Sequence, residues 1–235
     1  MSQPEFERAF EIVRNTLFEE PIEDPGDPIA CRMHDAFGVL DGVGHNCLGC
    51  NFAEITNGID HCLSKIVNTN ARIEFDFTDY IWWLYLFVER AEVLFEVIEL
   101  PASYRSRTFY PFVTIRRWAN FLKHPNFFVF VHHPKYFFEG DASFDETQFD
   151  FVVDTNFVRD NYGAEAKSRR GSVRAKLQNK NDIAVLFPNI IELTEEFCHC
   201  AYTIFELVER NEVYREVLSN VSTLEEYFAI ADQPE

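Results

Sequence analysis

An arginine, an amide and a histidine stand close together near the middle of the chain, where a helix is predicted to end. The segment Thr114–Pro125 reads TIRRWANFLKHP, and its final proline keeps the preceding residue out of the helical conformation. At about 100° per residue, Arg117 and His124 fall within roughly 20° of one another, with Asn120 on the same stripe. A guanidinium can hold a phosphodiester while a nearby imidazole, which titrates near neutral pH, moves protons. The spacing therefore indicates RNA phosphodiester chemistry, which needs no metal ion when the 2′-hydroxyl is the attacking group.

The same side chains also have a purely structural interpretation. Arg117 can pair with one of the many carboxylates of this acidic chain. His124 can cap the last carbonyls of the helix, where the helix dipole favours a cation. Spacing alone leaves both interpretations open, because arginine and histidine often occur together by chance. The elements that position the segment are therefore needed to choose between them.

The composition narrows the class of protein. The 235-residue chain is 47% hydrophobic and contains 25 phenylalanines, enough apolar material for one large domain or one domain with an insertion. Its net charge of -18 disfavours diffuse nucleic-acid binding without excluding a locally basic site. No secretory signal is recognisable, and the longest apolar run, Tyr80–Val88, is too short to span a bilayer. With six cysteines expected to stay reduced, we expect a cytoplasmic protein that does not enter a membrane.

Hydrophobic periodicity predicts a mainly α protein. Asp79 is the expected N-cap of the clearest helix, and a proline at position 101 is its expected stop. The stretch PIEDPGDP (Pro21–Pro28) is expected to be a linker or arm, and SYRSR a connection between helices. Apolar residues recur at helical spacing in five segments: Pro4–Glu19, Leu48–Asn68, Asp79–Leu100, Tyr110–Lys123 and Asn189–Leu218.

Between residues 127 and 187 the pattern changes from helical to extended. Short aromatic and β-branched runs such as FFVFVHH, FDFVVD and DIAVLF alternate with Gly, Asp and Asn clusters, which is typical of strands. We therefore predict an antiparallel helical bundle with a β-rich insertion between its last two long helices. The predicted parts are residues 1–28 (N-terminal helix and linker arm), 29–126 with 188–235 (bundle) and 127–187 (insertion).

A basic run within the predicted insertion departs from the acidic composition of the chain. KSRRGSVRAK, at residues 167–176, contains five basic residues in ten. Such a run can steer an RNA backbone toward an otherwise repulsive surface, or it can be a solvated loop. The adjacent His132 and His133 would face opposite sides of a strand, so both cannot easily serve one site. The candidate RNA-binding side chains are Lys123, Lys167, Arg169, Arg170, Arg174 and Lys176.

The cysteines offer one alternative, a structural zinc site. Cys47 and Cys50 form a CxxC with His45 nearby, and further Cys and His residues lie at positions 61–62 and 198–200. Structural zinc sites commonly use two such pairs, and this chain has one. On a helix, the cysteines at 198 and 200 would lie about 200° apart, so they could not bind one ion together. Buried packing thiols are the other interpretation, and the leading prediction includes no metal and no cofactor.

The arginine–histidine segment resembles the signature of the HEPN superfamily. Its members carry an Arg, four to six residues and then a His on a late helix of an all-α bundle, and Arg117, Asn120 and His124 fit this pattern at its long limit. Many HEPN proteins are metal-independent endoribonucleases of toxin–antitoxin or anti-phage systems, and they act as homodimers with two motifs facing one cleft. The resemblance implies that Arg117 holds the scissile phosphate, His124 is the general acid or base, and Asn120 is a supporting polar group. A β-rich insertion is not part of a minimal HEPN bundle.

From these observations we expect a HEPN-like, metal-independent endoribonuclease of a prokaryotic toxin or defence system. The implied partners are RNA, a second copy of the chain and, in a toxin system, an antitoxin protein. The alternative from another class is a catalytically inactive HEPN-like or all-α binding module for a protein partner or a nucleotide. In that alternative the face that carries Arg117 and His124 is structural.

Overall fold

The computed structural model describes helices and three short strands. The described residues are 3–18, 28–29, 48–68, 73–123, 130–131, 152–154, 183–184 and 189–219. Within them the chain is mainly helical, as predicted. The seven described helices are α1 (Gln3–Leu17), α3 (Leu48–Asn68), α4 (Ile73–Val97), α5 (Ala102–Thr108), α6 (Tyr110–Leu122), α10 (Ile190–Arg210) and α11 (Glu212–Ser219). None of these helices is long and apolar enough to span a bilayer.

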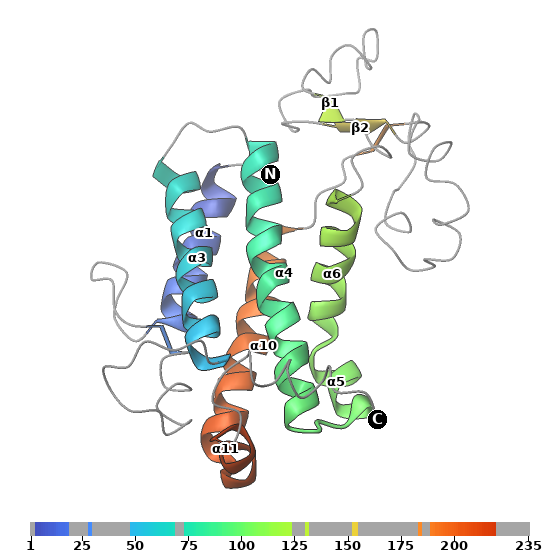
Figure 1. Cartoon of the computed structure of the whole chain (residues 1–235). Coiled ribbons are helices and arrows are strands. Elements are labelled where there is room, and N and C mark those ends of the chain that lie inside the picture. Colours follow the sequence, from blue (N-terminus) through green and yellow to red (C-terminus); the bar gives the residue numbers. More distant parts are fainter. Residues whose placement is uncertain are drawn as a thin grey trace, which may run out of the picture.

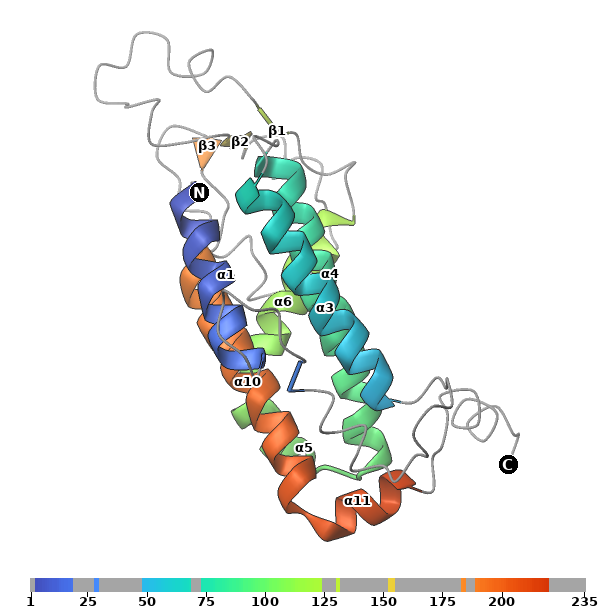
Figure 2. The same cartoon turned by 90° about the vertical axis from the view of Figure 1, so that its left-hand side faces the viewer.

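The five longer helices of the described part form a closed bundle (Figure 1). α1 packs on α3, α3 on α4, α4 on α6 and α6 on α10, and α10 returns to α1. Neighbouring helices run antiparallel except α1 and α10, which lie side by side in the same direction (Figure 2). The short helices α5 and α11 lie at the end of the bundle where α6 begins and α10 ends. The C-terminus of α6, where the arginine–histidine segment ends, is therefore at the opposite end.

A cluster of phenylalanine rings fills the centre of the bundle. The ring centroid of Phe87 on α4 lies 4.9 Å from that of Phe52 and 5.0 Å from that of Phe197, so this ring joins α3 to α10. Phe112 of α6 and Phe205 of α10 complete the cluster, at 6.2 and 6.0 Å from Phe87. Such aromatic pairs add about 0.5–1.5 kcal/mol each beyond the area that they bury. The apolar stripes predicted for α3, α4 and α10 are buried here, which confirms the helical periodicity.

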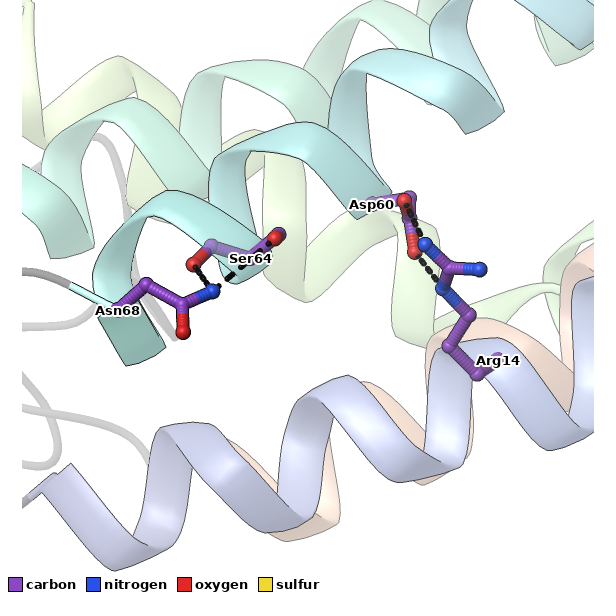
Figure 3. A network of polar contacts seen from close by, with 4 residues as sticks. All are labelled: Arg14, Asp60, Ser64 and Asn68. Atoms are coloured by element: carbon purple, nitrogen blue, oxygen red, sulfur yellow. Dashed lines mark hydrogen bonds and ion pairs between the residues drawn. The ribbon is translucent and has the colours of Figure 1, made fainter. Parts of the chain in front are cut away.

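One buried ion pair ties α1 to α3 (Figure 3). Two nitrogens of the Arg14 guanidinium face the Asp60 carboxylate: Nη2 donates to Oδ2 at 2.6 Å, and Nε pairs with Oδ1. The two side chains are only 11% and 13% exposed, and the rings of Phe10 and Phe18 flank the guanidinium. Burial raises the pKa of Asp60, and Arg14 opposes that shift. Because either charge alone would be buried without compensation, the pair fixes the position of α1 along α3.

The helix predicted from Asp79 begins earlier than its sequence pattern indicates. α4 starts at Ile73, so Asp79 lies exposed within the helix, and its prediction as the N-cap is wrong. The aromatic residues on either side of Asp79 explain the difference. Phe77 packs edge-on against Trp118 of α6, with 5.7 Å between the ring centroids, and Tyr80 is fully buried. Burial of these rings outweighs the capping preference of one aspartate.

Two further predicted elements differ in the structure. The SYRSR stretch, expected as a connection, forms the short helix α5 directly after Pro101. The predicted last helix is broken at Asn211 into α10 and α11. The Asn211 side chain accepts hydrogen bonds from the backbone N–H groups of Val213 and Tyr214, so it caps α11. An asparagine side chain competes in this way with the helical hydrogen bonds of the backbone, which is why α10 ends here.

Three short strands form an antiparallel sheet in the order β1–β2–β3. β1 (Phe130–Val131) pairs with β2 (Val152–Asp154), and β2 pairs with β3 (Ile183–Ala184). All three belong to the predicted β-rich insertion, and they lie near the end of the bundle where α6 finishes (Figures 1 and 2). The rest of residues 127–187 lies outside the described residues, so the extent of the insertion stays a prediction.

The predicted arm Pro21–Pro28 lies outside the described residues except for its last position. Pro28 forms an isolated antiparallel bridge with Phe18. Next to it, the N–H of Ile29 donates to the carbonyl of Leu17 at 2.8 Å. The chain at positions 28–29 therefore lies against the C-terminal end of α1.

Candidate functional site

Helix α6 carries the arginine–histidine segment, and its sequence explains its start and its orientation. Pro111 suits the first turn, because proline lacks the N–H group that this turn leaves unpaired. At 100° per residue, Arg117 lies roughly 165° and Asn120 roughly 135° from the centre of the buried stripe of the helix. Both side chains are half-buried and face the outside of the bundle. The buried stripe itself consists of Phe112, Ile115, Trp118, Ala119 and Leu122.

The end of α6 agrees with the prediction. The helix ends at Leu122, and the N–H of Lys123 still donates to the carbonyl of Ala119 at 3.0 Å. Lys123 is exposed in the turn that follows. His124, the predicted acid or base, lies outside the described residues, as does Pro125. The described part of the candidate site therefore consists of Arg117, Asn120 and Lys123.

The two adjacent arginines of α6 differ in their surroundings. Arg116 lies between two carboxylates of α4, with its Nε 3.4 Å from Glu89 Oε1 and its Nη2 3.2 Å from Glu92 Oε1. Arg105 of α5 approaches the other oxygen of Glu92 at 3.6 Å. Arg117 makes no hydrogen bond or ion pair with any residue that the structure describes. Arg116 is therefore paired with carboxylates of α4 at the surface of the bundle, whereas no described carboxylate compensates the charge of Arg117.

A tyrosine extends this ion-pair network along α4. Tyr85 shares a hydrogen bond with Glu89 one turn later, and its ring meets that of Trp82 edge-on at 5.6 Å. Burial and the nearby Glu89 carboxylate raise the pKa of Tyr85. The phenol therefore donates a hydrogen bond at neutral pH and is not a base. Its contact with Glu89 helps to hold this carboxylate where Arg116 meets it.

The buried cysteines are packing residues. Among the described residues, no group of three or more His, Cys, Asp or Glu side chains is arranged to hold a metal ion. Cys62, Cys198 and Cys200 are buried, and burial raises the pKa of Cys62 and of Cys200 to about 12. Without a bound metal these thiols are therefore protonated, and a zinc ion would have to displace their protons to bind them. The other zinc candidates are His45 and Cys47, outside the described residues, the half-buried Cys50, and the exposed His61 and His199.

Most of the predicted RNA-binding side chains belong to the predicted insertion. Lys123 is the one that the structure describes, and it lies in the turn directly after the helix that carries Arg117 and Asn120. The structure therefore brings together the α6 residues of the candidate site. The basic run at Lys167, Arg169, Arg170, Arg174 and Lys176 lies outside the described residues, as do His132 and His133.

The segment around α5 and α6 lacks acidic residues, a feature that the net charge of the whole chain conceals. Residues 100–138 contain no Asp or Glu, in a chain with 39 acidic residues among 235. α5 and α6 lie wholly within this acid-free segment. A count of charges segment by segment would have found it. The basic residues of the segment are Arg105, Arg107, Arg116, Arg117, Lys123 and Lys135.

Comparisons with known proteins add no family to these observations. No protein-family model matches the chain, and neither does any curated protein or any solved structure.

Proposed function

We propose that this chain is a HEPN-like, metal-independent endoribonuclease of a prokaryotic toxin or anti-phage system. The observation that carries the proposal is the difference between the adjacent arginines of α6. Arg116 is held by carboxylates of α4, while Arg117 faces outward with no partner among the described residues. A guanidinium that is not neutralised can bind a phosphodiester through two parallel hydrogen bonds. The mainly α bundle and the acid-free α5 and α6 support the same proposal.

In the proposed reaction the RNA supplies its own nucleophile. The 2′-hydroxyl attacks the adjacent phosphate, and His124 removes its proton or protonates the departing 5′-oxygen. Arg117 stabilises the negative charge that grows on the phosphate oxygens. Asn120, three residues after Arg117, donates a hydrogen bond to the phosphate or orients the imidazole. The products are a 2′,3′-cyclic phosphate and a 5′-hydroxyl.

A second copy of the chain completes the proposed site. Arg117 and Asn120 lie on the outer side of α6, where a second copy can reach them. Each copy contributes one guanidinium, from Arg117, and one imidazole, from His124. Two copies related by a two-fold axis bring two such pairs to one cleft. The β-rich insertion of residues 127–187, a cytoplasmic location and an antitoxin as protein partner belong to the same proposal.

Cleavage of RNA in the presence of a chelator tests the proposal. The wild-type protein is expected to cut RNA equally well with and without EDTA. His124→Ala is expected to reduce the rate by about 10²- to 10⁴-fold, the range that general acid–base catalysis contributes. Circular dichroism spectra of the variant control for folding. RNA that stays intact under both conditions, or cleavage that EDTA abolishes, would contradict the proposal.

A second candidate function is a binding module for a protein partner. The observation that favours it is the outer side of α4, where Trp82 and Leu86 lie one helical turn apart opposite the buried stripe. Leu86 is 40% exposed. A helix that is apolar on both sides commonly packs against a partner on each. Two results together would favour this candidate. The wild-type protein would leave RNA intact, and the Leu86→Glu variant would self-associate less than the wild type in analytical ultracentrifugation.

A further inference from the structure

We infer that the outer surface of α5 and α6 binds single-stranded RNA, with the ring of Tyr110 stacked on an unpaired base. The inference rests on the proposed function, because it names the substrate class and a specificity residue for the site at Arg117. It starts from two features of these helices, of which the second plays no part in the catalytic proposal. One is the absence of acidic residues on these two helices, and the other is an exposed aromatic ring.

Tyr110 belongs to the same outward stripe of α6 as Arg117. The two residues are separated by two helical turns, which places them within roughly 20° of one another and about 10 Å apart along the helix axis. The half-buried Val113 lies between them on this stripe, so apolar surface connects the ring to the guanidinium. Among the described residues, Tyr110 is one of three exposed large apolar side chains, and it is 55% exposed. An RNA strand with a phosphate bound at Arg117 therefore passes the flat ring of Tyr110 on the same helix.

The charges on this surface favour a polyanion. α5 and α6 carry four arginines and no acidic residue, although the chain as a whole has a net charge of -18. Arg105 and Arg116 are held by carboxylates of α4. Arg107 is exposed in the last turn of α5 and has no partner among the described residues. In sequence, Arg107 and Arg117, neither of which has a described carboxylate partner, stand on either side of Tyr110.

A single strand fits this combination better than a duplex or an acidic peptide. In a duplex the bases stack on one another, so an aromatic side chain cannot reach their faces without unstacking them. In single-stranded segments the faces of unstacked bases are free to stack on tyrosine, whichever base is present. An acidic peptide satisfies the arginines but offers the ring no base. The ring and the guanidinium groups together therefore select single-stranded RNA.

Binding measured separately from cleavage tests this inference. The probe is a short, fluorescently labelled 2′-O-methyl RNA, which lacks the attacking hydroxyl and stays uncut. In fluorescence anisotropy, Tyr110→Ala is expected to weaken its binding by about 5- to 150-fold, the range for loss of one base–aromatic stack. Tyr110→Phe keeps the ring and is expected to bind like the wild type. Val213→Ala, which removes an exposed apolar side chain from α11, is the matched control and should leave binding unchanged.

For Arg107, the expected effect is on the salt dependence of the affinity for the RNA probe. Arg107→Gln removes one phosphate contact, so the slope of log affinity against log salt concentration should become shallower by about 0.7. Tyr110→Ala should leave this slope unchanged, because stacking releases no counterions. Arg210→Gln removes an exposed arginine from α10 and is the control for the loss of one positive charge elsewhere.

The outcomes separate this inference from the proposed function. The inference is overturned by no binding of the probe, by equal affinity of wild type and Tyr110→Ala, by equal affinity for single strand and duplex, or by preferential binding of a polyglutamate peptide. Each of these results can occur in a protein that still cleaves RNA. Ring-dependent binding of the probe by a protein that cleaves no RNA would support the inference and overturn the catalytic proposal.

Discussion

Gly58 on α3 lies against the indole of Trp83 on α4, and replacing this glycine by alanine is expected to destabilise the bundle. A Cβ atom at Gly58 would overlap three ring carbons of Trp83. Alanine inside a helix ordinarily gains about 1 kcal/mol over glycine. Here the new methyl group must displace a rigid ring or separate two helices, and overpacking of this kind costs about 1–3 kcal/mol. The cost exceeds the gain, so Gly58→Ala should lower the free energy of unfolding by up to about 2 kcal/mol.

A double-mutant cycle with Trp83→Leu isolates the overlap. Leucine lacks the ring that the methyl group meets, so in this background Gly58→Ala should raise the free energy of unfolding by about 1 kcal/mol. Urea unfolding followed by circular dichroism gives both differences, and unchanged m values confirm that the transition stays two-state. Asn57→Ala, at the exposed neighbouring position, is the control and should stabilise by about 0.5 kcal/mol. A Gly58→Ala variant more stable than the wild type, or an equal effect in both backgrounds, would refute the close approach of α3 and α4 here.

Three further changes in stability follow from buried or strained groups and can be measured by urea unfolding. Arg14→Met should cost about 3 kcal/mol because it leaves Asp60 buried without its partner, and adding Asp60→Leu should recover most of this loss; no recovery would argue against the pair. Glu99, two residues after the end of α4, has a φ of 51°, so Glu99→Gly should stabilise by about 0.5–1 kcal/mol, and a loss of stability instead would contradict the strain. Cys62 and Cys200 have folded-state pKa values of about 12, raised from 9.0, so the stability that they contribute is complete below pH 9 and is lost as the pH rises toward 12. The loss should be about 1.4 kcal/mol per pH unit for each thiol, and Cys200→Ala should make the fall shallower; an unchanged fall would count against burial of this thiol.

The helices could be predicted from sequence wherever burial follows a regular period. α3 has the predicted bounds, Leu48–Asn68, because its apolar stripe is continuous from end to end. Helix ends were less predictable, since a capping residue contributes about 1 kcal/mol and tertiary packing can override it. At Asp79 the buried ring of Tyr80 and its neighbours outweighed the capping signal. At Asn211 the capping signal decided, and it was missed because the apolar pattern continues past it.

In the candidate site, too, the sequence predicts what depends on local spacing but not what depends on contacts with another helix. The spacing predicted that Arg117 and Asn120 share one stripe of a helix, and the described α6 places both away from its buried stripe, because helical geometry is local. The sequence could not tell which of the two adjacent arginines is neutralised. The carboxylates that decide this, Glu89 and Glu92, lie on α4, and no local pattern connects them to Arg116.

The pair Arg116→Gln and Arg117→Gln gives the most direct measurement of the central claim, because the same substitution is made at two adjacent positions with different surroundings. For each variant, the rate of RNA cleavage in EDTA and the urea midpoint are measured together. Arg117→Gln is predicted to lower the rate by about 10²- to 10³-fold, the typical loss of one transition-state contact, and to keep its midpoint. Arg116→Gln is predicted to keep its rate and lose at most about 1 kcal/mol of stability, because its ion pairs are half-exposed and screened by solvent. Equal losses of rate in the two variants, or a larger loss for Arg116→Gln, would contradict the account.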